Sequence, residues 1–577
     1  MDIFIPISTL IFFFLLFSIS KPLLQKCRNL PPSPPSIPIL GHLHLIKKPL
    51  HRSLTTLSDH YSPILSLCFG SRPVLLVSTP SLAEECLSKN DIIFANRPHI
   101  LAGKHINYNY SAIGLASYGP HWHNLRRILT IKIFSSSCIQ MFSVVRIQEV
   151  RSLVKDLFRD SELGKSVVEL KSKFSELTLK VMMGMIAGKR YYGDNVVDLE
   201  EAKWFQGIVK EALVLSGASY IGDFLPFLGW MDLGGVEKRM VRMVKDRDEF
   251  LQVLIDEHRR RKKNDNFSSS MEEEVEVEKK KKKKKTFIDV MLSLQETEPE
   301  YYIDQIIKGM LGALLNARTD TSALTTEWAM SLLLNHPDVL GKAKAELDMH
   351  VGPHSLDESD LAKLPYLHCI INETLRLYPV APLLLPHESS EESIIGGFNV
   401  PPGTMLWVNV WAIHRDPKVW MDPTNFKLER FQGIEGAKEG LKLIPFGYGR
   451  RACPSMGLDM RMMSLAMGTL IQCFEWEKRV GEEKVDMTEG PGLTMPQAQP
   501  LVSINHATPC SVYFLSSEYH TWLWAGLDGI WTLYGYFMVD YSCNDYLCPV
   551  FDMPRILPGI RLCEIIPCIK HPTGLIF

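Results

Sequence analysis

The stretch Pro-Phe-Gly-Tyr-Gly-Arg-Arg-Ala-Cys-Pro, residues 445–454, is the most informative part of this sequence. Its glycines allow a turn whose backbone approaches a flat ligand closely. Backbone N–H groups aimed at the sulfur of Cys453 would lower its pKa and hold it as a thiolate. Arg451 can pair with a carboxylate of the same ligand. These features suit a haem held by one axial thiolate. For a lone cysteine, a buried structural role is the common alternative.

The N-terminus is apolar and is followed by cations. Residues 3–19 contain few polar side chains, and Lys21, Lys26 and Arg28 come next. This length is at the short end for a membrane span. Cations on its C-terminal side favour a cytosolic location for the rest of the chain. We therefore expect a single-pass anchor over residues 1–20. A cleaved signal peptide is the alternative, but no small-residue cleavage site follows.

A proline-rich segment comes after the apolar one. Residues 30–38 read Leu-Pro-Pro-Ser-Pro-Pro-Ser-Ile-Pro, a composition that gives a stiff, extended chain. We expect a basic, proline-rich hinge over residues 21–38, with a plain disordered linker as the alternative. One folded domain is expected from residue 39 to residue 506, because the motifs below must meet at one ligand.

The charges are balanced overall but clustered locally. The net charge is −2, and the twelve cysteines show no CxxC metal spacing. Seven consecutive lysines occupy residues 279–285, close to three glutamates at 272–274. Dense like charges repel and stay solvated, and the acidic run cancels much of the positive field. We expect a disordered charged loop over residues 264–286 and no nucleic-acid partner.

Several segments have a clear local pattern. Two β-rich runs between residues 63 and 79 flank Gly70 and Ser71, which predicts a small hairpin. Residues 403–409 predict a strand. Residues 301–334 predict one long helix that ends before Asn-His-Pro.

Trp122 and Arg126 are four residues apart at the start of a predicted amphipathic helix. They therefore share one helix face. An indole N–H and a guanidinium on one face suit a carboxylate ligand. A core tryptophan with an arginine that reaches past it to water is the alternative.

The centre of the long predicted helix reads Ala-Arg-Thr-Asp-Thr-Ser at residues 317–322. Asp320 and Thr321 place an acid beside an alcohol, which suits proton delivery. A threonine bonded back to a helix carbonyl is the alternative. Arg318 needs water or a partner, because an unpaired buried charge is very unfavourable. Asp320 lies on a different helix face and cannot easily supply that partner.

Three patterns together resemble one family. Phe-x-x-Gly-x-Arg-x-Cys ending at Cys453, Trp-x-x-x-Arg ending at Arg126, and the stretch at residues 317–322 resemble motifs of the cytochromes P450. Residues 38–45, 103–106 and 386–390 resemble the plant microsomal members of the isoflavone 2′-/3′-hydroxylase-like group. The resemblance runs from the proline-rich segment to about residue 502.

The resemblance implies a mainly α fold with a small β region, an N-terminal transmembrane helix and a haem b whose iron binds Cys453. It implies haem contacts from Trp122, Arg126, His387, Phe446 and Arg451. The electrons come from NADPH through a separate reductase, in agreement with the lack of a dinucleotide fingerprint here. It implies an oxygen-activating role for Asp320 and Thr321.

Further roles follow from the same resemblance. Glu373, Arg376 and Arg430 correspond to a buried structural triad. The substrate contacts of the family correspond here to Tyr108, Tyr110, Leu314, Val380, Leu384 and Leu493. The expected substrate is a small apolar or phenolic compound of isoflavonoid type. The expected location is the membrane of the endoplasmic reticulum, with a cytosolic catalytic domain.

Two residues depart from the family pattern, because Arg318 and Ser455 stand where glycines are usual. Arg318 could crowd the oxygen pocket or turn aside toward water. Two alternatives to an active monooxygenase therefore stay open at this point. One is a haem-binding protein with impaired turnover, and the other is a membrane-anchored interaction protein without activity. Residues 507–577 match no family pattern, and we expect a disordered or spuriously translated tail.

Overall fold

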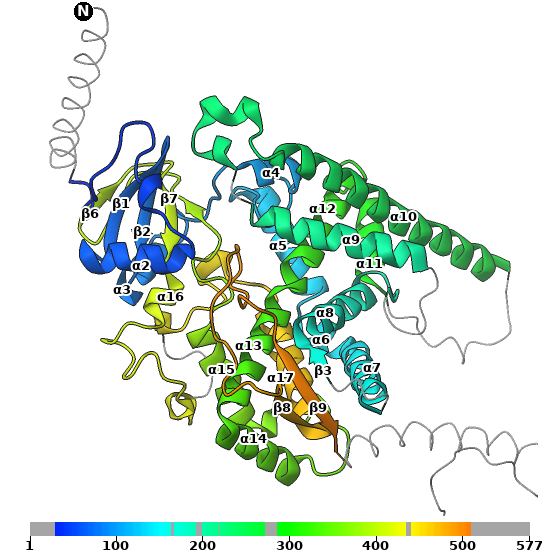
Figure 1. Cartoon of the computed structure of the whole chain (residues 1–577). Helices are drawn as coiled ribbons and strands as arrows, with labels where there is room; N and C mark the ends of the chain where they lie inside the picture. Colours follow the sequence, from blue (N-terminus) through cyan, green and yellow to red (C-terminus); the bar gives the residue numbers. More distant parts are fainter. Residues whose placement is uncertain are drawn as a thin grey trace, which may run out of the picture. The chain divides into compact units, whose positions relative to one another are not determined.

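The computed structural model describes residues 29–162, 167–191, 199–218, 220–271, 285–433 and 440–508 (Figure 1). All of them belong to one compact unit, Met1–Ser516. The predicted anchor at 1–20 and nearly all of the predicted tail lie outside the described residues. Within those ranges, no helix is both long and apolar enough to cross a membrane.

Helices make up most of the fold, which confirms the predicted mainly α class. The first half contains α2 (Leu50–His60), α3 (Pro80–Glu84), α4 (Leu101–His105), α5 (Pro120–Lys132), α6 (Ser136–Met141), α7 (Ser143–Glu162), α8 (Leu170–Ile186), α9 (Leu199–Ser216) and α10 (Val236–Met271). The second half contains α11 (Phe287–Thr297), α12 (Asp304–Thr319), α13 (Thr321–Asn335), α14 (Pro337–His350), α15 (Pro365–Leu377), α16 (Val410–Ile413) and α17 (Met456–Cys473).

Three small sheets accompany the helices. The first has the order β1 (Ile64–Phe69), β2 (Arg72–Val77), β7 (Met405–Val408) and β4 (His387–Glu388). The second has the order β3 (Val167–Glu169), β9 (Val502–Ala507) and β8 (Phe474–Lys478), and the third pairs β5 (Ser393–Ile395) with β6 (Phe398–Val400). Strands β1, β2 and β7 lie side by side in Figure 1.

The predicted hairpin and the predicted strand are both confirmed. Phe69 pairs with Arg72, so Gly70 and Ser71 form a two-residue turn between β1 and β2. Gly70 has φ +58°, and a Cβ there would lie 2.0 Å from the carbonyl oxygen of Phe224. Glycine is therefore required at this position for two independent reasons. The strand predicted at residues 403–409 is β7.

The single helix predicted over residues 301–334 is wrong, because the structure divides it at Asp320 into α12 and α13. Thr319 donates to the carbonyl of Leu315 (2.6 Å), and Thr321 donates to that of Ala317 (3.0 Å). Threonine hydroxyls that bond to carbonyls four residues back compete with the helix ladder and bend it. The break therefore lies where the sequence places its threonines.

Three predicted boundaries also move. Helix α10 continues to Met271, so residues 264–271 of the predicted loop are helical, and residues 272–284 lie outside the description. The tail was expected from 507, yet β9 includes Ala507, and the Thr508 hydroxyl donates to the carbonyl of Cys473 (2.9 Å). In the predicted hinge, the carbonyl of Pro32 accepts the Ser66 N–H (2.9 Å), which attaches residues 31–38 to β1.

The core is built around α13. Helices α8, α14, α15 and α17 pack against it, and its residues from Ser322 to Leu334 are all buried. Most of these residues are apolar, and hydroxyls such as those of Thr326 and Ser331 donate to carbonyls of the same helix. This arrangement places the α12–α13 break and the start of α17 close to each other, which matters for the site described next.

Candidate active site

The Cys453 loop is a tight turn held by its own backbone. The N–H of Cys453 donates to the carbonyl of Phe446 (2.8 Å), and α17 begins three residues later. Gly449 has φ +71°, and a Cβ there would lie 2.4 Å from the Leu87 carbonyl oxygen. Arg450 binds the carboxylate of Asp91 (2.7 Å) and fixes the outer side of the turn. The loop is therefore rigid before any ligand binds.

The electrostatics of Cys453 differ from the sequence-based expectation. Burial and the nearby Asp459 carboxylate raise the pKa of the Cys453 thiol. The hydroxyl and the backbone N–H of Ser455 act in the opposite direction, as does Arg318, but burial outweighs them. Hydrogen bonding from the loop backbone therefore lowers this pKa as expected, but it does not outweigh burial. A thiolate here needs a bound metal ion, which deprotonates a coordinating thiol.

Cations lie around the cysteine loop: Arg97 is buried, and Arg126 and Arg451 are half-buried. The guanidinium of Arg451 lies 4.5 Å from the ring centre of Trp122 and donates to the carbonyls of Ala95 and Ala116, at 2.6 Å each. Arg97 donates to the carbonyls of Leu385 (2.7 Å) and Pro386 (2.8 Å).

His387 follows directly on that segment. Its Nδ1 bonds to the carbonyl of Phe94 (2.7 Å). The structure thus brings together Trp122, Arg451 and His387, which are distant in sequence, and adds Arg97.

These cations repel one another. Burial and Arg451 lower the pKa of Arg97 to about 9, and burial and Arg126 lower that of Arg451 to about 10. Burial, Arg97 and Arg451 hold the pKa of His387 well below its ordinary value. Burial also lowers the pKa of Arg126, on which Cys453 acts in the opposite direction.

This arrangement fits a ligand that carries two carboxylates, as haem does with its propionates. Among the described residues, Arg97, Arg126 and Arg451 form no ion pair with a carboxylate, and the Nε of Arg97 is buried without a hydrogen-bond partner. An anion bound between these side chains would offset both the repulsion and the cost of burial. Sequence reasoning missed Arg97, whose only signal was its place in the conspicuous run Phe-Ala-Asn-Arg-Pro.

Helices α12 and α13 present one accessible stripe. Ala317 is exposed and Thr321 half-buried, whereas Arg318 and Thr319 between them are buried. Residues four apart share a helix face, so this stripe is the side of the helix that a ligand can reach. Asp320 accepts a hydrogen bond from the hydroxyl of Thr494 (2.7 Å).

Arg318 turns away from that stripe. Its side chain is 3% exposed, and its Nη2 lies 2.8 Å from Oδ1 of Asp459 on α17. Arg318 therefore does not turn aside toward water, and its cation is paired inside the protein. Its partner is a carboxylate that packing supplies from another helix. Asp459 gave no signal in the sequence except as an acid within an apolar helix.

The three residues of the predicted triad meet in the interior. Arg376 donates from Nε and Nη2 to the two carboxylate oxygens of Glu373, at 2.7 Å each. The Nε of Arg430 lies 3.4 Å from Oε1 of Glu373. Arg376 also donates to the carbonyls of His414 and Pro423, so the group joins α15 to the segments before the cysteine loop.

The predicted substrate contacts divide into two groups. Val380, Leu384 and Leu493 lie on segments that meet near the break, since the N–H of Met495 donates to the Val380 carbonyl (2.9 Å). Leu314 is buried in α12.

The two tyrosines differ from each other. The ring of Tyr108 lies over α12, where a Cβ at Gly309 would be 3.4 Å from it, and its hydroxyl donates to Asp248. Tyr110 instead stacks on His99 in its own loop, with ring centres 4.2 Å apart.

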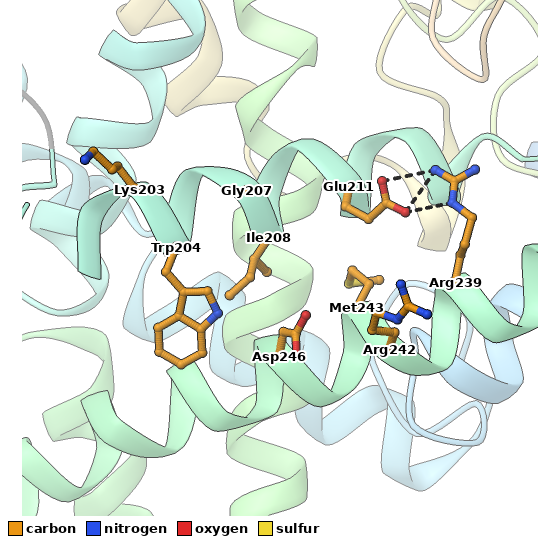
Figure 2. A pocket seen from close by; sticks show the side chains of 9 residues that line it. All are labelled: Lys203, Trp204, Gly207, Ile208, Glu211, Arg239, Arg242, Met243 and Asp246. Carbon is orange, nitrogen blue, oxygen red and sulfur yellow. Dashed lines mark hydrogen bonds and ion pairs between the residues drawn. The ribbon is translucent and has the colours of Figure 1, made fainter. Parts of the chain in front are cut away.

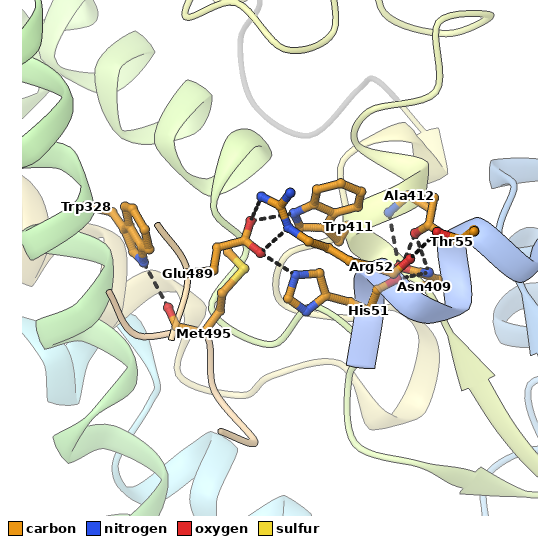
Figure 3. Close-up of polar contacts among 10 residues, drawn as sticks. His51, Arg52, Thr55, Trp328, Asn409, Trp411, Ala412, Glu489 and Met495 are labelled. Atoms are coloured by element: carbon orange, nitrogen blue, oxygen red, sulfur yellow. Dashed lines mark hydrogen bonds and ion pairs between the residues drawn. The ribbon is translucent and has the colours of Figure 1, made fainter. Parts of the chain in front are cut away.

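Glu489 anchors the segment that carries Leu493 (Figure 3). This buried carboxylate accepts from His51 (2.7 Å), from Arg52 (2.7 Å) and from the indole of Trp411 (3.0 Å). Burial alone would raise the pKa of Glu489, but these hydrogen bonds lower it to about 2. At the other end, the indole of Trp328 donates to the carbonyl of Met495 (2.8 Å). Sequence reasoning missed this anchor, because its donors come from two helices that are distant in sequence, α2 and α16.

A separate groove of about 480 Å³ lies between α9 and α10 (Figure 2). Trp204, Ile208 and Met243 line it together with an ion pair between Glu211 and Arg239 (2.9 Å). None of the predicted haem or substrate contacts lies on it. Its lining contains no thiol, so the Cys453 loop remains the candidate active site.

Comparison with known proteins gives consistent results. A family model described as cytochrome P450 matches residues 31–504. The isoflavone 3′-hydroxylase of Medicago truncatula is 52% identical over 491 residues, which cover 84% of this chain and 94% of that protein. The (+)-piperitol/(+)-sesamin synthase CYP81Q2 of Sesamum radiatum is 48% identical over 476 residues, with coverages of 82% and 90%.

A solved structure shows the same fold. A zebra fish cytochrome P450 with progesterone has a TM-score of 0.66 and 24% identity, and the match covers 80% of this chain and 100% of that one.

Proposed function

This chain belongs to the cytochrome P450 family, within its plant CYP81 group, and from this premise we propose that it hydroxylates a flat phenolic compound of isoflavonoid type. The family is one of haem-thiolate monooxygenases, so the reaction class is established. The substrate, the residue roles and the cellular partners are the proposal.

Haem supplies oxygen activation when it is bound, and the chain supplies its position. In this proposal Cys453, which lies in a tight turn, would bind the haem iron through its sulfur. Arg97, Arg126 and Arg451 would hold the carboxylates of the group, with His387 and Trp122 beside them. The observation that supports this assignment is that these three arginines form no ion pair with a carboxylate among the described residues, and that the Nε of Arg97 is buried without a hydrogen-bond partner. Phe446 accepts the Cys453 N–H and orients the loop.

Asp320 and Thr321 control protons and water on the accessible stripe of α12 and α13. Thr321 donates to the carbonyl of Ala317, which leaves its oxygen free to accept from a water molecule. Asp320 is held by the Thr494 hydroxyl on the substrate side. The pair can thus carry a proton from the segment around residue 494 to the stripe.

The observation that carries the substrate proposal is the set of apolar segments that converge on this break. Val380, Leu384 and Leu493 are aliphatic, and Glu489 and Met495 fix the segment between them. Ligand pockets are mostly apolar with a few fixed polar groups, as a flat phenolic requires. Relatives at 46–52% identity include hydroxylases of isoflavones, which supports that substrate class, and the sesamin synthase at 48% makes lignans the class to test beside it.

The family also suggests partners. We propose that electrons come from NADPH through a separate reductase and that the chain works at the endoplasmic reticulum membrane, as its plant relatives suggest. The predicted anchor would hold it there with the catalytic domain in the cytosol. The sequons at Asn109, Asn266 and Asn372 would then carry no glycan.

The test uses the full chain in microsomes with reductase and NADPH. Isoflavones, lignans and indoles are compared by their binding spectra and by the mass of any hydroxylated product. We expect a low- to high-spin shift and a hydroxylated product with isoflavones, neither of which Cys453→Ser should give. Turnover of lignans alone would overturn the isoflavone assignment. Substrate binding without turnover would favour a haem protein with impaired activity.

A further inference from the structure

Arg318 and Ser455, the two departures from the family pattern, contact the same carboxylate. Nη2 of Arg318 lies 2.8 Å from Oδ1 of Asp459, and the Ser455 hydroxyl donates to Oδ2 (2.7 Å). The hydroxyl of Ser322 donates to Oδ1 (2.8 Å). All four side chains are buried, and we call them the Asp459 cluster. The cluster reaches the metal ligand, because the Ser455 oxygen also lies 3.2 Å from Sγ of Cys453.

The hydroxyl of Ser455 lies near two acceptors, the carboxylate of Asp459 and the sulfur of Cys453, but has one hydrogen to donate. A serine hydroxyl carries one hydrogen that it can donate. While Cys453 is a thiol, the sulfur has its own hydrogen, and Ser455 can donate to Asp459 as observed. A thiolate bound to iron has no hydrogen, so the oxygen would then face a negative sulfur. The contact becomes favourable only if Ser455 turns its hydrogen from Asp459 to the sulfur.

Asp459 can release that hydrogen only because it has other partners. A buried carboxylate that loses a donor is costly unless a cation or further donors remain. Arg318 supplies the cation and Ser322 supplies a second donor. Within the described residues, the Nε and Nη1 of Arg318 have no hydrogen-bond partner, and its Nη2 makes the ion pair with Asp459.

We propose that Arg318 is a positioning residue that holds Asp459 and thereby frees the Ser455 hydroxyl to donate to the Cys453 thiolate. Hydrogen bonds to a metal-bound sulfur reduce its electron donation and raise the reduction potential of the metal centre. Arg318 and Ser455 therefore act as a pair: Arg318 neutralises Asp459, and this leaves the Ser455 hydroxyl able to donate to the sulfur of Cys453. This inference goes beyond the proposed function and holds whatever the substrate is.

The test is a double-mutant cycle on the full-length, haem-loaded protein, read by the ferric/ferrous reduction potential. Ser455→Ala removes the hydroxyl, and φ −96° at this residue suits alanine. In the native background this variant should lower the potential. Arg318→Met removes the charge and keeps most of the side-chain volume. In that background Ser455→Ala should leave the potential nearly unchanged, because the hydroxyl stays with Asp459.

Arg318→Lys is the matched control, since it keeps the cation and should restore the effect of Ser455→Ala. Equal shifts in the native and Arg318→Met backgrounds would overturn the proposal, as would no shift in the native one. If Arg318→Met loses haem, Arg318→Met with Asp459→Asn should regain it, because no buried charge is left unpaired. Failure of that double variant to retain haem would also contradict the assigned pairing.

Discussion

Three arginines around the cysteine loop carry charge that a bound anion must neutralise. Arg97, Arg126 and Arg451 contact carbonyls or remain without an acidic partner within the described part of the chain. Carbonyl oxygens satisfy hydrogen bonds but do not cancel a full charge in a buried place. These side chains are therefore costly without a ligand, and this cost favours retention of haem.

Arg97 tests that argument, because its pKa is lowered by burial and by Arg451. A charge-assisted hydrogen bond contributes about 1.5–3 kcal/mol, so Arg97→Gln should weaken haem retention about 10- to 100-fold. Haem transfer to an excess of apomyoglobin measures this loss. Arg450→Gln is the control, because its ion pair with Asp91 is partly exposed and on the outer side of the turn. Equal losses in both variants would contradict the assignment of Arg97.

Glu327 on α13 should make the stability of the fold depend on pH. Its Oε1 accepts the N–H of Leu501 (2.8 Å), and burial raises its pKa to about 7 from an ordinary 4.5. As pH rises from 4.5 to 7, the unfolded chain loses this proton first, so folding becomes less favourable. The cost approaches about 3 kcal/mol above pH 7.

Glu327→Gln should therefore match the native chain in unfolding free energy at pH 5 and exceed it at pH 8. Urea unfolding at the two pH values measures the difference. A stability difference between the two chains that is the same at pH 5 and pH 8 would show that Glu327 does not change its charge in this range.

At the scale of elements, the break between α12 and α13 combines local and distant causes. Thr319 and Thr321 bend the helix locally, whereas Thr494 binds Asp320 from a segment far along the chain. The motif at residues 317–322 was visible in the sequence, but its break was not, because helix periodicity continues through it. The direction of Arg318 could not be predicted either, since Asp459 reaches it only through packing of α17.

Elements with local determinants were easier to predict. The hairpin of β1 and β2 depends on a Gly-Ser pair between two apolar runs, and both signals are contiguous. The pair of Glu373 with Arg376 follows from helix spacing alone. Arg97 and Glu489 were missed, because their roles depend on segments that meet only in three dimensions.

The role proposed for the Thr321 hydroxyl at the α12–α13 break can be tested by its removal. Thr321→Ala should leave haem content unchanged but uncouple the reaction, so that NADPH is consumed with less product. Thr319→Ala is the matched control, because its hydroxyl also bonds four residues back but is buried away from the stripe. It should affect stability and not coupling. The ratio of product formed to NADPH consumed is measured for both variants. An unchanged ratio in Thr321→Ala would show that this residue does not belong to the proposed relay.

For the whole molecule, the described fold closes at Thr508. Strand β9 pairs with both β3 and β8, and the Thr508 hydroxyl donates to the carbonyl of Cys473 at the end of α17. A chain that stops after Thr508 should therefore keep its haem content. A chain that stops after Leu501 lacks β9 and should lose haem and stability. Loss of haem in the chain that stops after Thr508 would show that residues 509–577 support the fold.

The central claim for the molecule is that Cys453 binds haem iron as a thiolate although Arg318 and Ser455 stand where the family has glycines. The structure supports it, because Arg318 is paired with Asp459 and leaves the accessible stripe clear. The most direct test is the ferrous–carbon monoxide difference spectrum of the unmodified full-length chain. We predict a single band at the long-wavelength position of thiolate-ligated haem. A band only at the shorter wavelength of haem without a thiolate ligand would contradict the claim.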